Sequence, residues 1–123
     1  MHFSDGVRLY SAKDLLNFLG CAHSSALDLQ LLDRAITAPR GDKDEYLDLL
    51  KKKGNEHEAR YLGDLKAKGK SVTEIARDPS LAMMAEHTRQ AMRSGAEVIY
   101  QGALVHLPWH GYSDFLIRVE RPS

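Results

Sequence analysis

The hydrophobic pattern of this chain changes its period near residue 95. Before that point, apolar residues recur at helical spacing, most regularly in the stripe Leu81, Met84, Ala85, Thr88 and Met92. After it, residues 97–104 and 110–120 alternate with a period of two, which is typical of strands, and a loop around Leu107-Pro108 joins them. Because the helices come first and an antiparallel hairpin comes last, the sequence predicts an α+β fold.

The helical part divides at turn and capping signals. Ser11 and Asp14 form a capping-box pattern that predicts a helix over 11–20, and further helices are predicted over 23–35, 43–68 and 78–95. We expect the long helix to end near Gly69 and the last to end at Gly95. The clearest loop is 37–42, and the alternation over 71–76 predicts a short strand.

Length and composition narrow the class of protein. A chain of 123 residues suits one domain, and its formal net charge of zero argues against a purely electrostatic nucleic-acid binder but not against a local basic groove. A single cysteine, Cys21, excludes an internal disulfide framework and a cysteine-rich zinc site. Since the chain has neither a long apolar run nor a signal-peptide pattern, we expect a cytoplasmic protein with no membrane partner.

The apolar face of the long helix is interrupted by polar residues. On a helical wheel, Gly54, His57 and Glu58 fall in the arc occupied by Leu47, Leu50, Tyr61, Leu62 and Leu65. We expect all three to face inward, where a buried carboxylate needs a partner or a cation. Structural alternatives remain: His57 as an ordinary core histidine, and Glu58 either reaching the edge of the buried face or pairing with Arg89 or Arg93. The lysines at 51–53 fit a solvated face.

The last predicted strand also contains an unexpected carboxylate. Asp114 interrupts an apolar run, and Gly111 just before it suggests a bulge or a close approach of the backbone. Taken alone, Asp114 could equally be a turn or edge residue. An imidazole on a helix face and a carboxylate on a facing strand could, however, share a divalent cation, so His57 and Asp114 are candidate metal ligands.

Taken in order, segments of the chain resemble RecB-like nucleases of the PD-(D/E)XK superfamily, in particular the group of predicted RecB-family nucleases. The matching segments are 9–21 with His23 and Leu27, the helix segment 53–58, the strand segment 95–104, and the segment 109–116 with its Gly-x-x-Asp-Phe-Leu pattern. The resemblance covers nearly the whole chain, from about 8 to 121. It implies an incomplete core of the restriction-endonuclease type.

The resemblance also implies a set of functional residues. His57 matches a metal-binding histidine of the family, Asp114 matches its metal-binding and catalytic aspartate, and Glu58 would orient a ligand or a water molecule. The implied reaction is phosphodiester hydrolysis assisted by Mg²⁺ or Mn²⁺. The implied partner is DNA, with a helicase domain on the same or another chain. Candidate phosphate contacts are Arg8, Lys13, Lys51, Lys52 and Lys53.

The chain departs from the family at one essential motif. The family needs an acidic residue, any residue, and then a lysine on the next strand, and no such strand precedes Ser123. The expectation is therefore that residues 1–123 are the N-terminal portion of a single nuclease domain, inactive alone, rather than a natural short remnant. Some relatives hold a 4Fe–4S cluster, but Cys21 lacks the partner cysteines and is expected to be an ordinary half-buried thiol.

A second function is compatible with the same residues. The missing acid and lysine and the neutral net charge also suit a non-catalytic α+β module that binds nucleic acid or a protein partner. The two readings differ in one geometric respect. The nuclease reading requires the side chains of His57 and Asp114 to converge, and the binding module does not.

Overall fold

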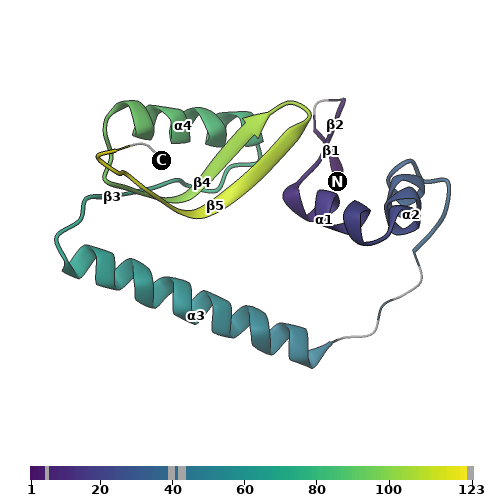
Figure 1. The fold of residues 1–123 in the computed structure, drawn as a ribbon, viewed down its shortest axis with the longest axis horizontal. Helices are drawn as coiled ribbons and strands as arrows, with labels where there is room; N and C mark the ends of the chain where they lie inside the picture. The colour runs from purple at the N-terminus through teal and green to yellow at the C-terminus, as the bar shows by residue number, and fades with distance from the viewer. Residues whose placement is uncertain (5, 39–40, 42–43, 122–123) are drawn as a thin grey trace. The chain divides into compact units, whose positions relative to one another are not determined.

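The computed structural model describes residues 1–4, 6–38, 41 and 44–121. Its helices and strands are β1 (His2–Ser4), β2 (Val7–Leu9), α1 (Ala12–Gly20), α2 (Ala22–Leu32), α3 (Glu45–Ala67), β3 (Val72–Glu74), α4 (Leu81–Arg93), β4 (Val98–His106) and β5 (Trp109–Ile117) (Figure 1). The α+β class and all the predicted helices and strands are confirmed, with ends that differ from the predicted bounds by at most three residues in either direction. The strands β1 and β2 were not predicted. Half of the predicted loop over 37–42 (residues 39, 40 and 42), and the first residue of the predicted helix over 43–68, lie outside the described residues.

The chain forms two compact units. The first contains residues 1–41 and 105–111, and the second contains residues 42–104 and 112–123. The β4–β5 hairpin therefore contributes its tip to the first unit and the remainder to the second. In the described part of the chain, no helix is both long and apolar enough to cross a membrane.

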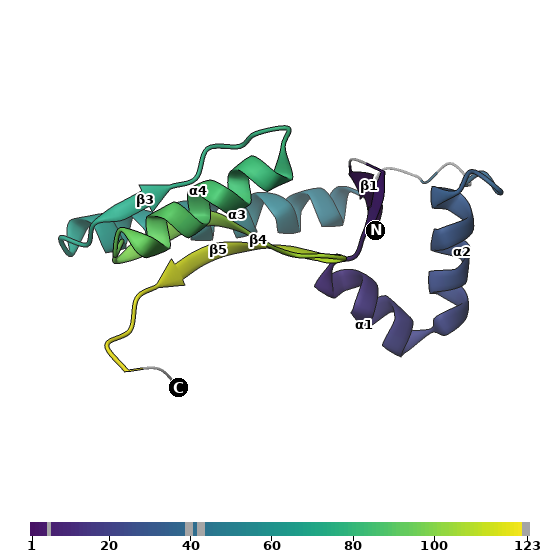
Figure 2. The ribbon, with the colours of Figure 1, turned by 90° about the horizontal axis from the view of Figure 1, so that it is seen from above.

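The first unit joins the β1–β2 hairpin to two short helices. The strands pair antiparallel, with His2 opposite Leu9, and Figure 2 shows α1 and α2 meeting at a sharp angle. The predicted capping box is present: Ser11 accepts a hydrogen bond from the backbone of Asp14, whose carboxylate accepts one from the Ser11 N–H. The N-terminal ammonium lies 2.7 Å from the same carboxylate.

These contacts change the acidity of Asp14. Burial raises its pKa, but hydrogen bonds from the N-terminal ammonium and from Ser11 outweigh burial and lower the pKa to about 2. Asp14 therefore stays a carboxylate that holds the start of α1 and the N-terminus together. It belongs to the structural framework of the first unit.

The second unit is a three-stranded sheet in the order β3-β4-β5, with a helix on each side (Figure 1). β3 runs parallel to β4, with Val72 opposite Val98. β4 and β5 are neighbours joined by a two-residue turn, which makes the pair antiparallel as predicted. Among the described strands, none pairs with the outer side of β5; Tyr10 forms an isolated parallel bridge with Trp109 at the start of β5, and the expected open edge is present beyond it.

The core of the second unit lies between α4 and the sheet. Met84, Thr88 and Val98 are its largest fully buried side chains. The hydroxyl of Thr88 donates to the Met84 carbonyl and accepts from the Ala103 N–H, so a helix side chain satisfies a strand amide. A Cβ at Gly102 would come within 3.0 Å of Leu116 and 3.3 Å of Thr88, so a larger residue would force these side chains to shift, and glycine favours this close packing.

Candidate metal and phosphate groove

A groove of about 500 Å³ in the second unit contains the residues that the sequence singled out. Lys51, Gly54, His57 and Glu58 reach it from α3, and Asp114 reaches it from β5; Asn55, Tyr61 and Phe115 complete its lining. The α3 residues share this groove because helical positions three and four apart lie on one face. The proposed partners His57 and Asp114 thus line the same groove although they lie far apart in sequence.

The prediction that Gly54 and His57 face inward to the core is wrong. Both are exposed, and Glu58 is half-buried. The reason is that the first half of α3 is not packed: Leu47 is 50% exposed and Leu50 is 48% exposed, whereas Leu65 near the helix end is 8% exposed. The wheel therefore identified the face that lines the groove, but this face is open to solvent.

Glu58 is held by residues of β4 and not by the arginines considered from the sequence. Its carboxylate accepts a hydrogen bond from the side-chain amide of Gln101. The Tyr100 hydroxyl also bonds to Glu58, which raises the pKa of that tyrosine. The alternative in which Glu58 pairs with Arg89 or Arg93 is wrong, because both arginines pair with Glu86 on their own helix.

Asp114 is exposed on the edge strand β5. The suggestion of a close backbone approach at Gly111 is wrong, because a Cβ added there would meet no atom within 4 Å. The next residue, Phe115, faces Tyr61 in an edge-to-face contact at 4.9 Å and lies 5.2 Å from the Tyr100 ring, measured between ring centroids. These aromatic contacts attach α3 to the sheet at the groove and fix one of its walls.

The donor set of the groove suits a hard cation only in part. An imidazole and two carboxylates are ligands that Mn²⁺ and Mg²⁺ accept. Across the described ranges, however, no three histidine, cysteine, aspartate or glutamate side chains lie close enough together to hold a metal ion. The described residues of the groove therefore do not form a complete metal site.

The candidate phosphate contacts fall in both units. Lys51 lines the groove, Lys52 is exposed beside it, and Lys53 pairs with Glu56 at 2.9 Å. In the first unit, Lys13 is exposed on α1 and Arg8 pairs with Asp33 at 2.9 Å. Of the five, Lys51 is the cation with a direct place in the groove.

Cys21 lies between α1 and α2, and its thiol is exposed. The expectation of a half-buried cysteine is therefore wrong. The chain turns sharply between the two helices here, which leaves the side chain outside the packed part of the first unit.

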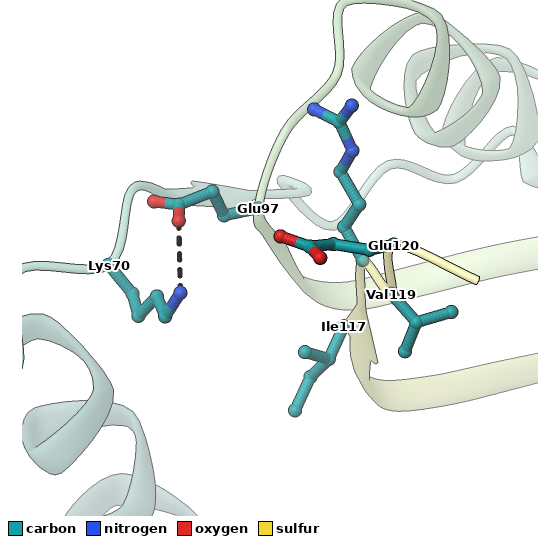
Figure 3. A pocket seen from close by; sticks show the side chains of 6 residues that line it. Lys70, Glu97, Ile117, Val119 and Glu120 are labelled. Atoms are coloured by element: carbon teal, nitrogen blue, oxygen red, sulfur yellow. Dashed lines mark hydrogen bonds and ion pairs between the residues drawn. The ribbon is translucent and has the colours of Figure 1, made fainter.

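A second pocket, of about 390 Å³, lies near the end of β5 (Figure 3) and is lined by Lys70, Glu97, Ile117, Arg118, Val119 and Glu120. The Glu97 carboxylate accepts hydrogen bonds from the Ser71 N–H at 2.8 Å and from Lys70 at 3.0 Å. These contacts, that of Ser71 foremost, lower the pKa of Glu97. Because both oxygens are occupied, Glu97 connects the start of β3 to the start of β4.

Sequence reasoning missed the residues that hold Glu58. Gln101 donates to Glu58 and accepts from Arg77 at 2.5 Å, and Tyr100 contacts the same carboxylate. A signal was present in the adjacent Gln101 and Gly102, because a polar residue followed by glycine inside an apolar strand indicates a bulge. No protein family, curated protein or solved structure matches this chain.

Proposed function

We propose that this chain carries part of the active site of a metal-dependent DNA nuclease of the RecB-like kind. The observation that supports the proposal is the shared groove of His57, Glu58 and Asp114, which come from a helix and from a strand far along the chain. The sequence resemblance implies that His57 and Asp114 bind a metal ion and that Glu58 orients a ligand or a water molecule. Their position around one groove supports that assignment.

In this proposal each residue has one task. His57 and Asp114 would bind Mg²⁺ or Mn²⁺, which would polarise the phosphate and lower the pKa of the attacking water. The Lys51 ammonium attracts a DNA phosphate into the groove. Glu58, held by Gln101 and Tyr100, accepts a hydrogen bond from the water and orients it. The acidic residue and the lysine of the next family motif would come from a segment outside these residues.

Metal binding tests the proposal directly. Titration of residues 1–123 with Mn²⁺, followed by electron paramagnetic resonance of the free ion, should show weak binding because the two ligands leave most of the ion hydrated. The double variant His57→Ala, Asp114→Ala should abolish it. A control double variant, His87→Ala and Asp64→Ala, removes an exposed histidine and an exposed aspartate outside the groove and should leave binding unchanged. Equal binding by all three proteins would contradict the proposal.

Cleavage assays test whether the site is incomplete. With single- or double-stranded DNA and Mn²⁺, we expect no cleavage at a useful rate, since each missing electrostatic group costs about 10²–10³ in rate. Cleavage that disappears in the His57→Ala, Asp114→Ala variant would keep the nuclease assignment. It would show that the missing groups are supplied from elsewhere, for example by a second copy of the chain.

A non-catalytic binding module is the second candidate, and the first unit favours it. Leu16 is 68% exposed and Leu19 72% exposed on α1, beside a pocket of about 220 Å³ that Phe18, Ser25 and Trp109 help to line. Exposed apolar surface of this kind suits a protein partner. This candidate would be favoured if the chain did not bind Mn²⁺ and if it retained a protein partner that the Leu16→Ser variant releases.

A further inference from the structure

The backbone of β4 departs from regular strand geometry next to the groove. Gln101 has a φ of 59°, in the left-handed region that residues other than glycine seldom adopt. The departure occurs immediately after the last pair of the parallel ladder, in which Glu74 lies opposite Tyr100. Strain of this kind persists only where the surroundings enforce it, and it concentrates at functional sites.

The consequence appears in the side chains. In a regular strand, neighbouring side chains point to opposite faces of the sheet. Here Tyr100 and Gln101 are consecutive, yet Gln101 donates to Glu58 on α3, and the Tyr100 ring lies 5.2 Å from that of Phe115, which contacts Tyr61 on the same helix. The left-handed residue therefore acts as a bulge does, turning a second side chain toward the face that carries α3.

Gln101 is itself held in position. Its amide oxygen accepts a hydrogen bond from Arg77 at 2.5 Å, so its NH₂ group is the end that is directed at Glu58. The Arg77 guanidinium lies over the Tyr112 ring, 5.1 Å from the centroid. The chain of contacts runs from Tyr112 through Arg77 and Gln101 to the Glu58 carboxylate in the groove.

We infer that Gln101 is a positioning residue, whose strained backbone and fixed amide hold the Glu58 carboxylate in place in the groove. The part of this inference that concerns metal binding rests on the proposed nuclease function. The geometric part does not, because it concerns contacts within the second unit alone. Gln101 acts through Glu58 and has no assigned contact with a substrate.

The test uses the whole chain and two variants. Gln101→Asn keeps an amide and tolerates a left-handed backbone, but its side chain is one methylene too short to reach both partners. Arg77→Met releases the amide oxygen of Gln101 and leaves the strand sequence intact. Gln90→Asn makes the same chemical change at an exposed glutamine of α4 and serves as the control.

The first measurement needs no metal. Nuclear Overhauser contacts between the Glu58 side chain and the Tyr100 ring should be strong in the unmodified chain. They should weaken at least about twofold in Gln101→Asn and in Arg77→Met, and remain unchanged in Gln90→Asn. Unchanged contacts in both folded groove variants would overturn the inference. If Gln101→Asn fails to fold, the contacts measured in Arg77→Met decide whether the inference holds.

The second measurement is the Mn²⁺ affinity of the same proteins. In the proposed function Glu58 accepts a hydrogen bond from a water molecule on the ion, and loss of such an outer partner typically costs about tenfold or more in metal affinity, so we expect a loss of this size in Gln101→Asn but not in Gln90→Asn. In a chain that already carries Glu58→Gln, adding Gln101→Asn should lower the Mn²⁺ affinity little further. If the unmodified chain binds Mn²⁺ no better than His57→Ala, Asp114→Ala, the proposed function fails, while the Overhauser contacts still decide the positioning. Normal Mn²⁺ binding by Gln101→Asn would overturn the part of the inference that concerns metal binding and leave the proposed function standing, while the Overhauser contacts decide the positioning.

Discussion

The two helices on either side of the sheet, α4 and α3, are held in very different ways. α4 has 13 residues and buries Leu81, Met84, Ala85, Thr88 and Ala91. α3 has 23 residues, of which Leu65 alone is buried. The face of a helix that packs along its whole length cannot offer its side chains to a ligand, whereas the same face of a helix attached by a few contacts can. The candidate site accordingly uses α3, and the stability of the unit depends on α4.

The contacts themselves explain the difference. α4 approaches the sheet over Gly102 and satisfies a strand amide through Thr88. α3 is attached by the Glu58–Gln101 hydrogen bond, by the Tyr61–Phe115 ring contact and by an exposed ion pair of 2.5 Å between Lys66 and Glu74. Because exposed ion pairs contribute little to stability, α3 is the less firmly attached of the two helices.

The largest effect should come from the α4 core. Met84→Ala removes a side chain that is 2% exposed, and the cavity should lower the free energy of unfolding by about 2–5 kcal/mol. The neighbouring Met83 is 51% exposed, so Met83→Ala should change the free energy of unfolding by about 0.5 kcal/mol or less. Urea denaturation of the two variants makes the comparison. Equal losses would show that the assigned face of α4 is wrong.

A smaller loss is expected at the hydrogen bond between α4 and β4. Thr88→Val keeps the volume but leaves the buried Ala103 N–H without its acceptor, which should cost about 1–3 kcal/mol in free energy of unfolding. Amide hydrogen exchange provides a local check, because the Ala103 amide should exchange faster in the variant. An unchanged rate at Ala103 would mean that another group protects this amide.

The same contrast explains what could be predicted from the sequence. The caps at Ser11 and Gly95, and the stripe of α4, depend on neighbours within one helix and were predicted correctly. Whether His57 is buried depends on how much of α3 the sheet covers. That is a property of tertiary packing, which a helical wheel does not contain.

The site residues divide in a similar way. His57, Glu58 and Asp114 could be found because ionisable residues in apolar patterns are unusual. Gln101 could not be assigned a role, because its importance comes from a backbone angle and from two partners, Arg77 and Glu58, that are remote in sequence. Its function is visible only when the strand and α3 are seen together.

The smallest predicted effect has the opposite sign and concerns α3 itself. A Cβ at Gly54 would meet no atom within 4 Å, and the same is true of Gly63 on the same helix. Because alanine restricts the unfolded chain more than glycine does, Gly54→Ala and Gly63→Ala should each raise the free energy of unfolding by about 0.5–1 kcal/mol. Thermal denaturation followed by circular dichroism measures this gain.

The two glycines should differ in ligand binding. Gly54 lines the groove beside His57, whereas Gly63 does not, so a methyl group at 54 narrows the space available to a phosphate or a hydrated ion. Gly54→Ala should therefore combine higher stability with weaker Mn²⁺ or DNA binding. Gly63→Ala should raise stability by a similar amount and leave binding unchanged. Loss of stability at Gly54 would show that this part of α3 is covered by a packed surface, and the contrast between a packed α4 and an open α3 would then be wrong.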